Sequence, residues 1–390
     1  MPDRPAPPLA DVPAPFGGAF AGRSVFVTGH TGFKGSWLCL WLERLGAQVT
    51  GYALDPPTDP AHLIVSGAAE RLVADHRADV RDRKRLAAAI DEADPDLILH
   101  LAAQTVVRTG YEEPFETFDV NVMGTAAVLD VVRVRSARGE KPVSVVCVTS
   151  DKCYENVEQV WGYRETDAMG DHDPYGGSKG AAELAIRSYR HSFFPSHKLA
   201  EHRVRLASAR AGNVIGGGDW TRDALVVDVI AALNAGDPVP LRSPGAYRPW
   251  QHVLQALDGY LTLAAGLLTA PADRVEPLLS GFNVGPLPGH ALSVREVVEI
   301  LFEEWGAGEW TDESGGNHPR EAGLLHLAID KAMSVLGWKP VWDVREALRQ
   351  TAHWYKEYRD EPAAARRIGE GQIAQYEAAM RMRRDVTREF

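Results

Sequence analysis

Two groups of side chains in the sequence have the types and spacing needed for proton chemistry. Tyr175 and Lys179 stand four positions apart in Y-G-G-S-K, so on a helix both side chains share one face. A nearby ammonium would lower the pKa of the phenol and make Tyr175 a general base. Pairs with this spacing also occur by chance on many helices, so the weight of this pair depends on its surroundings.

The second group is the triplet Ser150-Asp151-Lys152, which directly follows an apolar segment. Open α/β sheets bind their ligands at the carboxyl ends of the strands. The triplet therefore supplies a candidate hydroxyl that orients Tyr175, a candidate acid and a candidate base. The alternative is a solvated turn with a local ion pair, which is weaker because such a turn does not need to follow a buried strand.

A glycine-rich segment upstream, T-G-H-T-G-F-K-G, predicts a dinucleotide site. Gly29 allows a tight turn, Gly32 lets the backbone approach a pyrophosphate, and Gly35 permits close packing of a helix on a strand. The phosphates would rest on the N-terminus of that helix. The positive nicotinamide ring of such a cofactor would act together with the ammonium in lowering the pKa of Tyr175. A glycine triplet can be a simple turn, but the readable strand before it and helix after it favour a nucleotide site. The other expected cofactor contacts in this segment are Thr31, Phe33 and Lys34.

Asp55 follows the second expected strand and predicts which dinucleotide is bound. A carboxylate there would accept hydrogen bonds from the adenosine ribose and repel a 2′-phosphate, which favours NAD over NADP. The alternative is a turn residue before two prolines. Further contacts are expected from the adenine side and from the end of the next strand, at Asp79, Val80, Leu101, Ala102 and Ala103.

Short apolar runs alternate with helical segments along the chain, the pattern of a parallel sheet with crossover helices. Strands are expected at 24–28, 48–53, 97–101 and 143–149, and helices at 35–45, 83–92, 117–135 and 175–193. The fold class is α/β, a Rossmann-type doubly wound parallel sheet with a smaller, mixed C-terminal substrate-binding lobe. The expected divisions are a Pro-rich arm (1–22), an NAD-binding domain (23–208), a substrate lobe interleaved with returns to the main sheet (209–360) and a charged helical tail (361–390).

Composition excludes several classes of protein. The 390 residues carry a net charge of −11, which argues against a nucleic-acid surface. The sequence contains no run of about 18 apolar residues, so it predicts no membrane span. The N-terminal segment lacks the features of a signal peptide. The three cysteines have no metal-ligand spacing, so we expect free thiols in a reducing cytoplasm and no metal site.

Seven segments together resemble the CDP-glucose 4,6-dehydratases, a family of NAD-dependent extended short-chain dehydrogenases/reductases that act on nucleotide sugars. They are TGHTGFKGSWL, HLAAQ, TSDKCYEN, WGYRE, DPYGGSK, ARAGNVIGGGDW and RPWQHV, and the resemblance runs from about residue 24 to residue 355. The similar dTDP-glucose dehydratases carry Thr-Asp-Glu at the triplet, so Lys152 separates this chain from them. Sugar 4-epimerases share the glycines and the Tyr/Lys pair without the acid and base.

The resemblance implies a reaction and the residues that perform it. CDP-glucose would be oxidised at C4, lose water across C5 and C6, and regain the hydride at C6, with tightly bound NAD regenerated. Ser150, Asp151, Lys152, Tyr175 and Lys179 would be catalytic, and the last two would also contact NAD. The implied substrate contacts are Gln104, Arg108, Asn213 and Arg248, the last gripping the pyrophosphate as a fork or, alternatively, forming a surface ion pair. Trp250 and His252 are expected to be packing residues.

Other readings remain open. The chain could be a 4,6-dehydratase or a 4-epimerase for another nucleotide sugar, or a non-catalytic NAD sensor. The family implies a homodimer or homotetramer built on the helices at 117–135 and 175–193, although their apolar Val128, Val131, Ala182 and Ile186 could equally be core. The chain departs from the family pattern at Thr105, at Arg320-Glu321-Ala322 and at Ala328.

Overall fold

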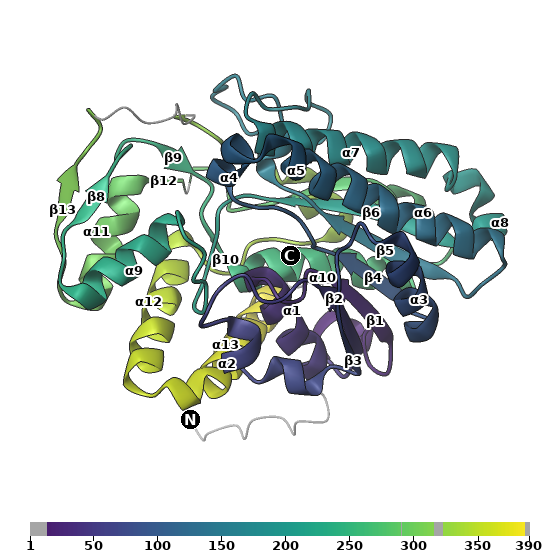
Figure 1. Ribbon diagram of the computed structural model, residues 1–390, viewed down its shortest axis with the longest axis horizontal. Helices are drawn as coiled ribbons and strands as arrows, with labels where there is room; N and C mark the ends of the chain where they lie inside the picture. The colour runs from purple at the N-terminus through teal and green to yellow at the C-terminus, as the bar shows by residue number, and fades with distance from the viewer. Residues whose placement is uncertain (1–13, 290, 316–322, 387–390) are drawn as a thin grey trace.

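A seven-stranded parallel sheet forms the centre of the protein, in a computed structural model that describes residues 14–289, 291–315 and 323–386 (Figure 1). The strand order is β11-β6-β5-β4-β1-β2-β3, and every neighbouring pair is parallel. This confirms the expected fold class. The strands are β1 (Ser24–Thr28), β2 (Gln48–Ala53), β3 (Ala74–Arg77), β4 (Leu97–His100), β5 (Val143–Val148), β6 (Val204–Ala211) and β11 (Gly281–Val284).

Helices cover both faces of this sheet, as a parallel sheet requires. One face packs against α3 (Arg83–Ala93), α6 (Gly124–Ala137) and α7 (Pro174–Ser192). The other packs against α1 (Phe33–Arg44), α10 (Val253–Thr269), α12 (Val344–Asp360) and α13 (Ala365–Val386). Each face of the sheet has its own hydrophobic core. The central strands are therefore packed on both faces.

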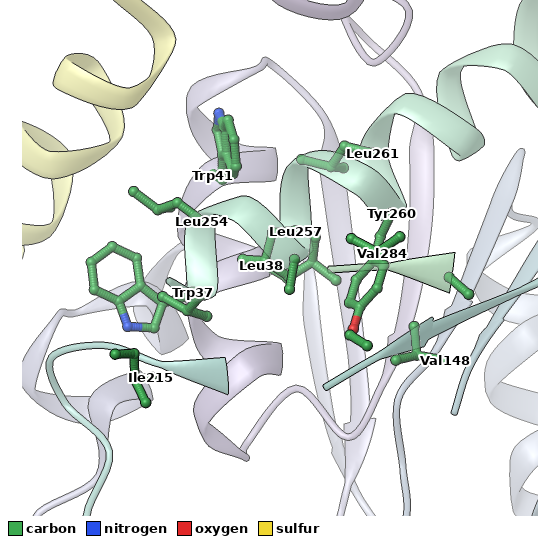
Figure 2. Packing of buried hydrophobic residues seen from close by; sticks show 14 of the residues in the cluster. Trp37, Leu38, Trp41, Val148, Ile215, Leu254, Leu257, Tyr260, Leu261 and Val284 are labelled. Atoms are coloured by element: carbon green, nitrogen blue, oxygen red, sulfur yellow. The ribbon is translucent and has the colours of Figure 1, made fainter. Parts of the chain in front are cut away.

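The core beside α1 and α10 is built from large side chains (Figure 2). Figure 2 shows residues of α1 and α10 facing each other and the strand ends of β5 and β11. Each of these large apolar side chains is buried, and full burial of one stabilises the fold by about 1.5–3 kcal/mol. The labelled residues are Trp37, Leu38, Trp41, Val148, Ile215, Leu254, Leu257, Tyr260, Leu261 and Val284.

A smaller lobe is formed largely by the chain between β6 and α12. It contains three two-stranded pairs, β7 (Val214–Ile215) with β10 (Gln251–His252), β9 (Tyr247–Arg248) with β12 (Leu292–Ser293), and β8 (Val239–Leu241) with β13 (Trp310–Asp312). Helices α9 (Leu225–Ala235) and α11 (Val294–Trp305) complete it. Between these parts the chain returns to the main sheet as β11, which pairs with β6, and this is the interleaving that the sequence predicted.

The remaining elements are short. They are the helices α2 (His62–Val65), α4 (Val107–Glu112), α5 (Pro114–Phe118) and α8 (Leu199–His202), and the single turns η2 (Pro15–Gly18), η3 (Ala68–Arg71), η4 (Asp119–Met123), η5 (Asp151–Cys153), η6 (Ser196–Lys198), η7 (Glu276–Leu278), η8 (Ala332–Leu336) and η9 (Pro362–Ala364).

The expected long helix at 117–135 is confirmed, and it carries a π-bulge. Helical residues run without a break from 114 to 137 through α5, the π-helical turn η4 and α6. Asn121 lies in the bulge, and its side-chain amide donates to the Gln104 carbonyl at 3.0 Å and to the Ser178 hydroxyl at 2.8 Å. π-bulges of this kind often occur at functional sites.

The two ends of the described chain pack on the main body. Residues 1–13 of the expected N-terminal arm lie outside the described residues, but Phe16 and Phe20 are buried. At the other end, Glu377 of α13 accepts hydrogen bonds from Trp41 at 3.0 Å and from Arg44 at 3.1 Å. The charged C-terminal helix is therefore docked onto α1.

Three further observations concern the residues that the structure describes. None of their helices combines the length and the apolar character needed to cross a membrane. Their His, Cys, Asp and Glu side chains form no group of three or more that could hold a metal ion. Cys39, Cys147 and Cys153 are free and buried, as expected.

Candidate active site

The glycine loop joins β1 to α1, as the sequence predicted, and its backbone demands glycine at two positions. Gly29 has a φ of 73°, and a Cβ there would lie 2.6 Å from the Ala102 nitrogen. A Cβ on Gly35 would lie 2.2 Å from the Gly29 carbonyl oxygen. Gly32 caps α1 without any side-chain hydrogen bond. The N–H groups at this helix end are left without a side-chain partner, an arrangement that suits a diphosphate.

Residues around the loop extend this nucleotide site. Thr31 is buried, and Phe33 begins α1. The Lys34 Nζ lies 6.0 Å from the centre of the Tyr260 ring. Burial lowers the pKa of Lys34 to about 8, although Asp151 and Asp219 oppose that shift. This ammonium therefore extends from the glycine loop towards the groups at the end of β5.

The more distant residues assigned to the cofactor differ in their surroundings. Asp55 is exposed just after β2, where a ribose could reach it, and 101–103 follow β4 half-buried. The carboxylate of Asp79 is occupied by Arg81, whose guanidinium donates to it at 2.6 to 3.1 Å. Val80 is buried, and a Cβ on Gly124 would lie 2.7 Å from its Cγ1. The adenine contacts of Asp79 and Val80 remain predictions.

The triplet lies where the sequence placed it, directly after β5, and its first two residues are buried. Ser150 is 7% exposed and Asp151 is 3% exposed, which excludes a solvated turn. The Ser150 hydroxyl donates to Asp151 Oδ1 at 3.0 Å, and the Lys152 N–H donates to the same oxygen at 2.9 Å. Asp151 Oδ2 has no hydrogen-bond partner among the described residues.

Burial determines the protonation of Asp151. Desolvation raises its pKa above the ordinary value, although Lys152, Ser150 and Arg248 oppose the shift. An aspartic acid that holds its proton can donate it, and the unpartnered Oδ2 is the atom from which a proton can leave. Lys152 is half-buried on the same turn, so an acid and a potential base lie side by side.

Tyr175 and Lys179 lie one turn apart near the start of α7. The helix is capped by Asp173, which accepts from the Gly176 N–H at 2.9 Å. The Lys179 Nζ lies 5.8 Å from the centre of the Tyr175 ring, and both side chains are buried. Ser150 and Asp151 of the triplet both affect the pKa of Tyr175, so this pair lies next to the triplet.

Burial dominates the electrostatics of this pair in the chain alone. It raises the pKa of Tyr175, and Ser150 only partly opposes the shift. Burial, with the nearby Lys34 charge, lowers the pKa of Lys179 to about 7. The lowered tyrosine pKa that we predict for the site with a positive nicotinamide ring beside it therefore stays a prediction.

The expected substrate residues are not equally available. Arg248 is 7% exposed and lies near Asp151, so it is not a surface residue. Half-buried Asn213 follows β6. Arg108 is 49% exposed and pairs with Asp223 at 3.0 Å. The Gln104 amide is engaged within the chain, accepting from the Val106 N–H and donating to Thr117.

Sequence reasoning missed the buried ion pair behind the site, formed by Glu183 of α7 and Arg210 of β6 at 2.8 Å. Glu183 also accepts from the Thr149 hydroxyl at 2.6 Å and the Ser208 hydroxyl at 2.9 Å. Thr149 directly precedes the triplet, so this carboxylate ties the end of β5 to the helix of Tyr175. A signal was present, because Glu183 stands four positions after Lys179 on the same helix face.

Comparisons with known proteins agree with this geometry. The sequence profile of the GDP-mannose 4,6 dehydratase family matches residues 26–203. A CDP-glucose 4,6-dehydratase from Salmonella typhimurium is 46% identical over 336 residues, which span 86% of this chain and 91% of that protein.

Solved structures share the fold. A dTDP-glucose 4,6-dehydratase from Streptomyces venezuelae with NAD bound is 22% identical, with a TM-score of 0.69 over 87% of this chain and 99% of that one. A UDP-glucose 4-epimerase from Thermus thermophilus in complex with NAD is 25% identical, with a TM-score of 0.68 over 85% and 98% of the two chains. Because the Salmonella protein shares 46% of aligned residues over most of both lengths, the chain belongs to the CDP-glucose 4,6-dehydratase family.

Proposed function

We propose that the protein is a lyase that converts CDP-glucose to CDP-4-keto-6-deoxyglucose with tightly bound NAD. The observation that carries this proposal is the buried Ser150–Asp151 hydrogen bond at 3.0 Å beside Tyr175, whose pKa both residues affect. The Salmonella relative, a CDP-glucose 4,6-dehydratase at 46% identity, supports the choice of nucleotide. The uncapped N-terminus of α1 supports the dinucleotide.

Oxidation at C4 would be assigned to the residues of α7. NAD, when bound, would supply the acceptor and later the donor of a hydride. Tyr175 would remove the proton of the 4-hydroxyl, and Ser150 would hold the phenol in the required orientation. The raised pKa of Tyr175 in the chain alone means that a positive ring beside it must favour the phenolate. Lys179 would add to that field when protonated.

Elimination across C5 and C6 would be assigned to the triplet. A ketone at C4 acidifies the C5 proton, and Lys152 would take it. Asp151 would protonate the departing 6-hydroxyl from Oδ2, and burial favours this role because it raises the pKa of the carboxyl. Arg248 would hold the pyrophosphate as a fork, with Asn213, Arg108 and Gln104 as further substrate contacts.

The assignment is tested by incubating the protein with CDP-glucose and with dTDP-glucose and following the alkaline absorbance of a 4-keto-6-deoxy sugar. We expect signal with CDP-glucose. A signal with dTDP-glucose alone would transfer the activity to another nucleotide, and a 4-epimer without loss of water would make the protein an epimerase. Asp151→Asn and Lys152→Glu should reduce elimination more than oxidation, and an equal loss of both steps would contradict the acid and base assignments.

We also propose that residues 23–208 bind NAD, that 209–360 bind the nucleotide sugar, and that the protein acts as a homodimer or homotetramer. Val128, Val131, Ala182 and Ile186 are buried in the core of one chain, so they are not available for pairing. The support comes instead from exposed apolar side chains on α5, η4 and α7, namely Phe115, Phe118, Met123, Leu184 and Phe193. Light scattering of Phe115→Glu against the unchanged protein tests this, and an identical mass for both as multimers would contradict it.

We place the protein in the cytoplasm. Three buried cysteines without a disulfide are typical of a reducing compartment. Fractionation of the producing cells tests the proposal, and recovery in an extracytoplasmic fraction would contradict it.

A further inference from the structure

A buried histidine at the end of β4 has no part in the proposed chemistry, yet it joins elements from both sides of the site. His100 is 3% exposed. Its Nδ1 lies 2.7 Å from the hydroxyl of Thr28, the last residue of β1 before the glycine loop. Its Nε2 lies 3.0 Å from the hydroxyl of Thr125 in α6. The ring therefore connects the strand that leads into the glycine loop to a helix on the same face of the sheet as α7.

The partners of the two threonines fix the hydrogens of this histidine. The Thr125 hydroxyl donates its one hydrogen to the Asn121 carbonyl at 2.7 Å, so His100 Nε2 is the donor in the bond between ring and hydroxyl. The Thr28 hydroxyl accepts from the backbone N–H groups of residues 101 and 102, both at 3.2 Å, and its own hydrogen is left for Nδ1. His100 is therefore the uncharged tautomer with its hydrogen on Nε2.

Asn121 extends these hydrogen bonds to the helix of the proposed base. Its side-chain amide donates to the Ser178 hydroxyl at 2.8 Å, and that hydroxyl donates to the backbone carbonyl of Tyr175 at 2.7 Å. The same amide forms two bonds with the backbone of Gln104, at 2.9 and 3.0 Å. An unbroken series of hydrogen bonds thus runs from the end of β1, through His100, to the turn of α7 that carries Tyr175.

Both ends of this series border the proposed reaction. At one end, a Cβ on Gly29 would lie 2.6 Å from the Ala102 nitrogen, so the glycine loop touches the segment at 101–103 that is expected to line the cofactor. The five side chains of this His100 network, all of them buried, are Thr28, His100, Asn121, Thr125 and Ser178. Bulk water therefore does not compete for their hydrogen bonds.

We propose that His100 is a positioning residue for hydride transfer, which keeps the end of β4 that lines the cofactor in register with the turn of α7 that carries Tyr175. The inference rests on the proposed function, in which hydride leaves C4 of the sugar while Tyr175 takes the proton of the 4-hydroxyl. A misplacement of about 1 Å can lower a rate about 10²-fold, so the register of these two elements matters.

A direct role of His100 as acid or base is excluded by its surroundings. Both ring nitrogens are occupied by threonine hydroxyls inside the fold. Burial, with the nearby charge of Lys179, lowers the pKa of His100 to about 3. The ring therefore acts through the elements that it joins and not on the sugar itself.

A first experiment interrupts the His100 network with a side chain of similar shape. Thr125→Val removes the hydroxyl that accepts from His100 and donates to Asn121, whereas Thr125→Ser keeps a hydroxyl. Turnover of the NAD-loaded enzyme is measured with CDP-glucose and with CDP-glucose deuterated at C4. We expect Thr125→Val to lower kcat per folded molecule at least about tenfold and to show a deuterium isotope effect on kcat, because hydride transfer then limits turnover. Thr125→Ser should restore the rate.

Thr351→Val is the matched control. Thr351 is buried in α12 and donates to the carbonyl four residues earlier at 2.7 Å, as Thr125 does, but it lies outside the network. This variant should leave kcat per folded molecule and the isotope effect unchanged, with the folded fraction measured by circular dichroism.

A second experiment needs neither substrate nor cofactor. Histidine rings labelled with nitrogen-15 are observed by NMR, and His100→Gln, which keeps one donor and one acceptor, identifies the His100 signals. We expect a hydrogen on Nε2 alone throughout the range of about pH 5 to 8, in which an ordinary histidine titrates. Thr125→Val should shift the Nε2 signal and Thr351→Val should not. A hydrogen on Nδ1, or protonation of the ring in this range, would overturn the network.

The outcomes separate this role from the proposed function. If the unchanged enzyme forms no 4-keto-6-deoxy product from CDP-glucose, the proposed function fails, and the role of His100 in that reaction fails with it. If the enzyme turns over but Thr125→Val leaves kcat intact, or lowers it without an isotope effect, the network only supports the fold and the positioning role alone is overturned. An equal loss of kcat in Thr351→Val overturns it as well.

Discussion

The buried ion pair between Glu183 and Arg210 offers the strongest test of how the site is held together. Glu183 is 3% exposed and Arg210 is 4% exposed, with their charged atoms 2.8 Å apart. Glu183→Gln changes neither size nor shape but removes the negative charge. The Arg210 guanidinium is then left buried without its counter-charge, although the Tyr154 hydroxyl at 2.7 Å and the Glu165 carbonyl at 3.3 Å still accept from it.

The expected loss of stability is large. Breaking a buried pair by removing one partner costs about 3–5 kcal/mol, because the remaining charge stays desolvated. Unfolding in urea, followed by circular dichroism, measures the change in free energy. Glu303→Gln is the control, because Glu303 pairs with Arg345 at 2.9 Å with both side chains more than 60% exposed. An exposed pair of that kind contributes about 0–1 kcal/mol.

The pH dependence of this loss has a defined sign. Burial would raise the pKa of Glu183, but Arg210 and the hydrogen bonds outweigh it and lower the pKa below its ordinary 4.5. A carboxylate with a lowered pKa in the fold stabilises it fully above pH 4.5, and that contribution is lost as pH falls through the folded pKa. The difference between wild type and Glu183→Gln should therefore shrink below pH 4.5. A difference under about 1 kcal/mol at neutral pH would refute the reasoning.

Four further substitutions test other parts of the structure. Gly217→Ala should destabilise the protein by about 1–3 kcal/mol in urea unfolding, because the new Cβ would lie 1.9 Å from the Trp354 ring. Gly371→Ala should stabilise α13 by about 0.5–1 kcal/mol, because a Cβ there meets no atom within 4 Å. Burial lowers the pKa of His62 from 6.5 to about 3. The contribution of His62 to the free energy of unfolding therefore falls as pH drops below 6.5, by about 2 kcal/mol at pH 5. His62→Gln should remove this contribution to the pH dependence measured by urea unfolding. Tyr175→Phe should reduce product formation about 10²–10⁴-fold with an unchanged circular dichroism spectrum, and retained turnover would contradict its role as base.

The sequence predicted the elements whose signals are local. β1 and β2 begin and end at the predicted residues, because each is a buried apolar run between polar or glycine-containing segments. β3 was missed, since Ala74–Arg77 lies at the sheet edge and its residues have no apolar pattern. The π-bulge at 119–123 within the predicted helix was also beyond reach, because its Asn121 is hydrogen-bonded to residues distant in sequence.

The candidate site shows the same division between residue identity and environment. The sequence located the triplet and the Tyr175–Lys179 pair, whose positions follow from a strand end and a helix face. It did not show the burial that raises the pKa of Tyr175 in the chain alone, because spacing does not report burial. It also missed Arg210 of β6, whose partners come from α7 and the segment after β5.

The fold alone does not decide between dehydration and epimerisation. A UDP-glucose 4-epimerase shares it with a TM-score of 0.68, and so does a dTDP-glucose 4,6-dehydratase with a TM-score of 0.69. We propose that the deciding groups are those at the end of β5. There Glu183 fixes Thr149, and through it the triplet, against the helix of Tyr175. Oxidation and elimination can then act on one bound sugar without its release, because their catalytic groups are held in one hydrogen-bonded frame.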